Sequence, residues 1–127
     1  MNRHNVSSGS PFEPRIGLSR AVRIGNIIAV SGTAPLVDGK TAHPGDVYAQ
    51  TKRCIEIMLE ALAKAGGSPE HVIRTRVMLT DIARWQDAGR AHGEVFGAIR
   101  PANTVVAISR FIDPEWLVET ELDAVVA

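Results

Sequence analysis

The sequence predicts an α+β domain in which a mixed sheet carries two helices packed on one face. The order of elements along the chain, β-β-α-β-α-β-β with a possible leading strand, is the first observation behind this fold class. The second is patterning, because two long segments repeat apolar residues every three or four positions while the others are short apolar or alternating runs. At 127 residues the chain has room for one domain, 1–127.

The amino-terminal part predicts an irregular start followed by a β-hairpin. Residues 1–14 are rich in serine, glycine and proline, which favours irregular chain with a possible short strand. Two apolar runs, 21–24 and 27–31, then flank Gly25-Asn26, a pair typical of a two-residue hairpin turn. Residues 36–45 contain one Asp-Gly and one Pro-Gly turn signal, so we expect a surface loop there.

Two helices are predicted from their caps and apolar stripes. Asp46 should cap a long helix that ends at Gly66-Gly67. Its stripe consists of Val47, Cys54, Met58, Ala61, Leu62 and Ala65. Asp81 should cap the second helix. That stripe consists of Trp85, Ala88, His92, Val95 and Phe96. Gly89 and Gly93 each cost about 1 kcal/mol relative to alanine in a helix, so we expect another backbone to approach closely there.

Three further strands complete the predicted sheet. Residues 72–79 alternate, which indicates a strand covered on one side. Its covered face should carry Ile73, Thr75, Val77 and Leu79. Residues 105–108 form a nearly continuous apolar run, typical of a strand buried on both faces. In residues 117–124 one face is apolar, while Glu119 and Glu121 point together to the other. The two acids are therefore directed at something other than the core.

Composition excludes several functional classes. Fourteen basic and fourteen acidic residues cancel, which disfavours binding to nucleic acid or an anionic membrane. The single cysteine, Cys54, lies in a helix stripe and is interpreted as a buried structural thiol. No metal-ligand spacing, phosphate loop or nucleophile elbow is present, so no metal or other cofactor is expected. Without a signal-peptide pattern or membrane span, a cytoplasmic protein is the default.

Four segments in order carry a family resemblance that covers nearly the whole chain. They are 25–35, 50–67, 77–81 and the pair Pro101-Ala-Asn-Thr104 and Val118-Glu-Thr-Glu121, which lie about fifteen residues apart. Together they resemble the RidA/YjgF family of reactive-intermediate deaminases. The resemblance implies a chorismate-mutase-like fold and homotrimers whose sheets line a central barrel. Sites for a small-molecule metabolite would then lie in the clefts between subunits.

The resemblance also assigns roles and exposes departures. In the family, the glutamate that corresponds to Glu119 orients the attacking water, and we adopt Glu119 as the catalytic candidate. Typical members carry an arginine where this chain has Asn103, a tyrosine where it has Leu18, and an asparagine where it has Gly89. An arginine would grip a substrate carboxylate through charge-assisted bonds of ~1.5–3 kcal/mol each, whereas an asparagine carries no charge. A 2-imino acid should therefore bind poorly unless another cation substitutes.

Further binding candidates each have a plain structural alternative. Arg20 is the best substitute cation, although it could be a solvated strand arginine. His92 is either a neutral core histidine or a proton shuttle at the cleft. Thr104 follows Asn103 and is expected beside the ligand. The segment Ser31, Gly32, Thr33 could offer backbone donors and a hydroxyl to an anion, or could simply form a turn.

These observations leave three functional hypotheses. The first is a divergent hydrolase acting on a C–N bond of a small imine, enamine or related carbonyl metabolite, not the standard 2-iminobutanoate/2-aminoacrylate deaminase. The second is a ligand-binding or sensing trimer that has kept the cleft without the chemistry. The third is the endoribonuclease or translation-inhibitor role sometimes attached to the family name. The neutral charge and the lack of stretches that interleave aromatic and basic residues make it the weakest.

Overall fold

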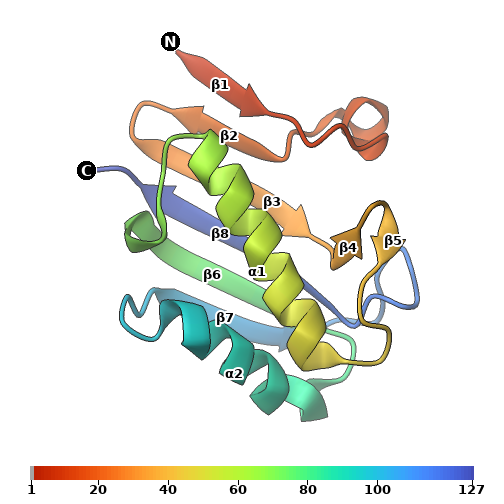
Figure 1. The fold of residues 1–127 in the computed structure, drawn as a ribbon. Coiled ribbons are helices and arrows are strands. Elements are labelled where there is room, and N and C mark those ends of the chain that lie inside the picture. Colours follow the sequence, from red (N-terminus) through yellow and green to blue (C-terminus); the bar gives the residue numbers. More distant parts are fainter. Residues whose placement is uncertain (1) are drawn as a thin grey trace.

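A computed structural model describes residues 2–127 as a six-stranded mixed sheet with both α-helices on one face (Figure 1). This confirms the predicted α+β class. In chain order the elements are β1 (Arg3–Val6), η1 (Glu13–Gly17), β2 (Ala21–Ile24), β3 (Ile27–Thr33), β4 (Leu36–Val37), β5 (Lys40–Thr41), α1 (Val47–Lys64), η2 (Pro69–His71), β6 (Val72–Leu79), η3 (Ile82–Arg84), α2 (Trp85–Phe96), β7 (Ala102–Ala107) and β8 (Val118–Val125).

The sheet has the strand order β1-β2-β3-β8-β6-β7. All neighbours pair antiparallel except β6 and β7, which are parallel and joined by α2. The C-terminal strand β8 therefore lies in the middle, between β3 and β6, while β1 and β7 are the edges (Figure 1). In the β2–β3 hairpin, Gly25 has φ 60°, the left-handed value that favours glycine in a two-residue turn.

The long helix begins as its cap predicts, whereas Asp81 caps a 3₁₀ turn ahead of the second helix, which begins at Trp85 without a side-chain cap. The Asp46 carboxylate accepts a hydrogen bond from Ala49 N at 2.9 Å and starts α1. At the other end Gly66 takes φ 89°, and a side chain there would collide with the Arg23 guanidinium. Asp81 caps the short 3₁₀ turn η3, which leads directly into α2. None of the helices within residues 2–127 is long and apolar enough to cross a membrane.

The core lies between the helices and the sheet. The buried face of β8 carries the predicted Val118, Thr120, Leu122 and Ala124, which are at most 1% exposed. The whole predicted stripe of α1 is buried with it. Cys54 belongs to this core, and burial raises the pKa of its thiol far above the ordinary value. A buried neutral thiol fits the structural role assigned from the sequence.

Several local predictions were wrong. Ile73 is exposed because a bulge between Val72 and Arg74 shifts the register against β8. Residues 36–45 are not a plain loop, since β4 and β5 form a small hairpin there. Trp85, the first residue of α2, is also exposed.

The edge strand β7 and the glycines of α2 also differ from expectation. β7 is not buried on both faces, since most of its residues are exposed in this chain, and it is an edge strand that pairs only with β6 within residues 2–127. A Cβ atom at Gly89 or Gly93 would meet nothing within 4 Å, so no backbone of the described chain approaches them. β7 and this part of α2 together form an open flank of the molecule.

Candidate functional site

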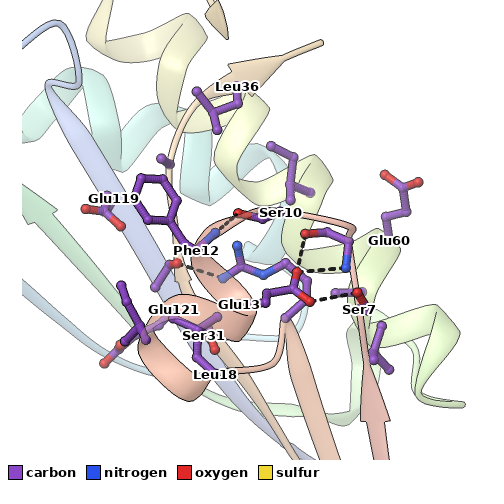
Figure 2. Close-up of a pocket in the computed structure, with 18 of the residues that line it drawn as sticks. Ser7, Ser10, Phe12, Glu13, Leu18, Ser31, Leu36, Glu60, Glu119 and Glu121 are labelled. Atoms are coloured by element: carbon purple, nitrogen blue, oxygen red, sulfur yellow. Dashed lines mark hydrogen bonds between the residues drawn. The ribbon is translucent and has the colours of Figure 1, made fainter. Parts of the chain in front are cut away.

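A cavity of about 730 Å³ lies beside the central strands, between the amino-terminal segment, one side of α1 and the start of β8 (Figure 2). It brings together five of the nine residues singled out from the sequence as site candidates, which are Leu18, Arg20, Ser31, Gly32 and Glu119. It also contains residues that the sequence argument passed over, among them Glu13 and Trp116. This cavity is the candidate site.

A β-bulge shapes the wall of the cavity. Val30 pairs with Leu122 and Thr33 with Thr120, so three steps along β3 match two along β8. The extra residue lies at Ser31-Gly32 and turns the backbone toward the cavity. A Cβ atom on Gly32 would lie 3.5 Å from Oε1 of Glu119, so the carboxylate lies close against this bulged backbone.

Glu119 is a half-buried carboxyl whose environment favours its protonated form. Burial raises its pKa above the ordinary value, Arg20 opposes that shift, and Glu121 adds to it. A carboxyl with a raised pKa is a better proton acceptor once ionised and can exchange protons closer to neutral pH. The side chain therefore has the electrostatics of a general base or acid, in a cavity large enough for a ligand.

Arg20 is held across the bulge from Glu119. Its Nη2 donates to the carbonyl oxygen of Gly32 at 2.7 Å, whereas its buried Nε has no hydrogen-bond partner within residues 2–127. Burial lowers its pKa, while the charges of Glu13 and Glu119 raise it. Beside it the Ser31 hydroxyl donates to the carbonyl of Ser19 at 2.6 Å. Arg20 is thus a partly exposed cation on the cavity wall.

Glu13 is a second acid of the cavity and was missed from the sequence. Three donors hold its carboxylate: Ser7 Oγ at 2.7 Å, Ser8 N at 2.9 Å and Ser8 Oγ at 2.6 Å. These bonds, led by that from the Ser8 hydroxyl, lower its pKa to about 2. The signal was present as a serine-rich stretch just before an isolated glutamate, but composition alone described it as irregular chain.

Replacing Glu13 with glutamine should lower stability at pH 7 and leave it nearly unchanged at pH 2. The folded-state pKa of about 2 lies below the ordinary 4.5. The contribution is therefore fully present above pH 4.5 and is lost as pH falls toward 2. Denaturant midpoints of the two proteins between pH 2 and 7 test this, and curves separated by the same amount at every pH would contradict it.

Glu121 lines the same cavity but is engaged elsewhere. Arg76 Nη1 lies 2.7 Å from Glu121 Oε1, across the β6–β8 pair on the sheet face that the helices leave open. A paired carboxylate is a weaker candidate for proton transfer than Glu119.

The remaining candidates lie outside the cavity in this chain. Asn103 Nδ2 donates to Thr75 Oγ1 at 3.0 Å, and Thr75 Oγ1 lies 2.7 Å from His92 Nε2. Burial lowers the pKa of His92, which favours the neutral ring. Asn103 and His92 thus share a buried hydroxyl at the β7–α2 flank, on the opposite side of β8 from the bulge (Figure 1).

Two threonines complete the account of the sequence candidates. Thr104 is exposed on edge strand β7. Thr33 is fully buried, and its hydroxyl donates to the carbonyl of Ser31 at 2.7 Å, so it supports the bulge from behind. Within residues 2–127 no group of three or more His, Cys, Asp or Glu side chains is placed to hold a metal ion.

Fold and cavity together define a small α+β protein in which a half-buried acid on β8 and a cation just before β2 lie beside the bulge of β3. The sequence model of the family described as Endoribonuclease L-PSP matches residues 9–126. A crystal structure from Mycobacterium tuberculosis, of a member of the YjgF/YER057c/UK114 family, superposes with a TM-score of 0.90 at 43% identity. It covers 98% of this chain and 100% of that one. The chain belongs to this family, the RidA/YjgF family.

Two relatives extend the comparison. An uncharacterized protein of Streptomyces coelicolor is 40% identical over 119 residues, 94% of this chain and 89% of its own. A protein of Acinetobacter baylyi named 3-aminoacrylate deaminase RutC is 33% identical over 110 residues, 86% of this chain and 84% of its own. The family includes a member named for the removal of an amino group from a small unsaturated acid.

Proposed function

We propose that this protein hydrolyses a C–N bond of a small imine, enamine or related carbonyl compound. One observation carries the proposal: the carboxyl of Glu119, whose pKa is raised, lies in a ligand-sized cavity against the backbone of Gly32. A Cβ atom built on Gly32 would be 3.5 Å from Oε1 of Glu119. The relative named as a 3-aminoacrylate deaminase supports the same class of chemistry. Zero net charge argues against a polyanion such as RNA as the substrate.

The proposed reaction needs only this acid and water. Glu119 accepts a proton from a water whose oxygen bonds to the imine carbon, and the electron pair of the C=N bond moves to nitrogen. The same carboxyl returns the proton to that nitrogen, which gives a carbinolamine. In the second half Glu119 takes the hydroxyl proton and passes it to nitrogen as the C–N bond breaks. Ammonia leaves and the ketone or aldehyde remains.

We further propose that the working form is a homotrimer. The helix-free face of the sheet and most of strand β7 are uncovered in one chain, and a second subunit is the natural cover. A neighbour would also bring its Asn103 and His92 flank toward Glu119. Light scattering at micromolar concentration should give three chain masses, and a single chain mass would contradict the assembly.

Replacing Asn103 with arginine should raise turnover of 2-imino acids. One charge-assisted bond of ~1.5–3 kcal/mol corresponds to a gain of about tenfold or more, provided that the new guanidinium reaches the carboxylate. Semicarbazide-trapped turnover of 2-iminobutanoate by wild type and variant is the measurement. Leu18 and Gly89 still depart from the family pattern, so the gain should be partial.

Asn103→Lys is the matched control, because lysine adds the charge without the planar two-pronged contact. It should gain less than Asn103→Arg. If the wild type already matches an arginine-containing relative on this substrate, another cation binds the carboxylate and the emphasis on position 103 is wrong.

A further inference from the structure

The side-chain amide of Gln50 binds the backbone on both sides of Trp116, a residue of the cavity wall. Gln50 on α1 is fully buried, and its Oε1 accepts from Leu117 N at 2.9 Å. Its Nε2 donates to the carbonyl of Glu115 at 3.0 Å. The backbone is therefore fixed on both sides of Trp116, so the indole has a defined position before any ligand arrives.

The indole of Trp116 has an unused donor. The side chain is only 7% exposed, yet its buried Nε1 has no hydrogen-bond partner within residues 2–127. Buried donors are nearly always paired, so each exception calls for an explanation. Trp116 lines the same cavity as Glu119, so a ligand that displaces the side chains covering Nε1 can supply the acceptor.

Part of the cavity wall is apolar. Several large side chains share the cavity, namely Phe12, Ile16, Leu18, Leu36, Ile57 and Ile112. Figure 2 labels Phe12, Leu18 and Leu36 among the side chains that line the cavity. Ile16 is 62% exposed and Ile112 is 72% exposed, so they offer apolar surface to an incoming molecule. At about 730 Å³ the cavity far exceeds what a three- or four-carbon substrate occupies.

The charges in the cavity do not favour an anion. Four glutamates line it but only three cations, Arg20, Arg53 and Lys64. Arg20 is bound to the Gly32 carbonyl, and Arg53 Nε donates to the carbonyl of Leu36 at 2.8 Å. Lys64 is exposed at the end of α1. A carboxylate would therefore meet two arginines that already donate to backbone carbonyls and one solvated lysine.

We propose that the substrates are uncharged imines that carry a branched or aromatic group, that the product ketones bind in the same way, and that Trp116 Nε1 donates to an acceptor atom of the ligand. This inference deepens the proposed function and rests on it. The apolar group would lie against the side chains around Phe12 and Leu36, and the reacting carbon would face Glu119. Leu18 fits this reading, because its apolar side chain lines the cavity.

Calorimetric titration with three stable ketones tests the substrate class on the full-length protein. The probes are 4-phenylbutan-2-one, butan-2-one, which lacks the ring, and 2-oxo-4-phenylbutanoate, which carries a carboxylate. The phenyl ketone should bind at least about tenfold more tightly than butan-2-one, because the ring buries apolar surface. It should also bind no more weakly than the carboxylated probe. Equal binding of the two uncharged ketones, or a clear preference for the carboxylate, would overturn the proposal.

Trp116→Phe tests the donor itself, because it keeps the ring and removes the N–H. It should weaken binding of 4-phenylbutan-2-one by about three- to tenfold, as expected for one hydrogen bond. Trp85→Phe is the control, since Trp85 is the other tryptophan and lies exposed on α2. It also leaves Trp116 as the sole tryptophan, whose fluorescence should change on binding. Unchanged affinity in Trp116→Phe would overturn the role of the indole.

The binding measurement also separates this inference from the proposed hydrolysis. Glu119→Gln should still bind 4-phenylbutan-2-one while losing turnover. Binding without turnover in the wild type would contradict the proposed hydrolysis but not the proposed ligand class. Turnover of small imines without preferential binding of the phenyl ketone would contradict the ligand class but not the hydrolysis.

Discussion

Replacing Glu119 with glutamine is expected to lower imine hydrolysis by roughly 10²–10⁴-fold, the range typical of losing a positioned general base. Glutamine keeps the shape of the side chain but cannot accept the proton of the attacking water. The substitution should not destabilise the fold, because burial already disfavours the charged carboxylate. Semicarbazide-trapped turnover on the best imine, with thermal unfolding in parallel, measures both effects.

Glu121→Gln is the matched control on the same face of β8. It breaks an ion pair with Arg76 that is about one-third to two-fifths exposed on each side, so its effect on stability should be small. Turnover should stay within a few-fold of wild type. A loss as large as that of Glu119→Gln would mean that the two carboxylates act as a unit. Full activity of Glu119→Gln would refute the proposed chemistry.

The raised pKa of Glu119 also predicts a pH dependence. Because the base must be ionised to accept a proton, activity should rise with pH through the raised pKa, above the ordinary 4.5. Stability should change in the opposite sense. The folded state binds this proton more tightly than the unfolded chain, so the contribution of Glu119 falls as pH rises through the same window.

Periodicity was sufficient to predict the fold, because burial in a sheet or helix imposes a repeat of two or 3.6 on the sequence. The alternation of β8, the stripe of α1 and the caps at Asp46 and Asp81 were all readable in this way. Errors arose where a single residue breaks the repeat. The bulge that exposes Ile73 has no local signal, and the exposure of β7 depends on what lies beside it rather than on its own apolar residues.

The candidate site was only partly predictable, because it depends on contacts between distant segments. Glu119 was readable from the alternation of its own strand, and Arg20 from its place near Leu18. Glu13 and Trp116 were not readable in this way. No local pattern shows that serines bind the Glu13 carboxylate, or that an amide on α1 binds the backbone on both sides of Trp116. Asn103 was expected beside Glu119, yet in one chain strand β6 separates β7, which carries Asn103, from β8, which carries Glu119, and a shared site would require a second subunit.

The largest expected effect on stability comes from Gln50→Ala. The side chain is fully buried and makes three hydrogen bonds, with Leu117 N, with the carbonyl of Glu115 and with that of Ala42 at 3.2 Å. Alanine leaves those backbone groups unpaired and opens a cavity, which together should cost roughly 3 kcal/mol or more. For a chain of this size the melting temperature should fall by about 10 °C. Calorimetric unfolding at fixed protein concentration is the measurement, because assembly would couple stability to concentration.

Gln86→Ala is the matched control, because the only other glutamine of the chain is exposed on α2. It should change stability by less than about 0.5 kcal/mol. Gln50→Ala should in addition release the backbone around Trp116 and so weaken binding of 4-phenylbutan-2-one, whereas Gln86→Ala should not. If the buried amide connects the core to the site, Gln50→Ala should lower both the melting temperature and the affinity for 4-phenylbutan-2-one. A destabilised Gln50→Ala variant that binds the ketone with unchanged affinity would show that the hydrogen bonds of Gln50 stabilise the fold but do not affect the site.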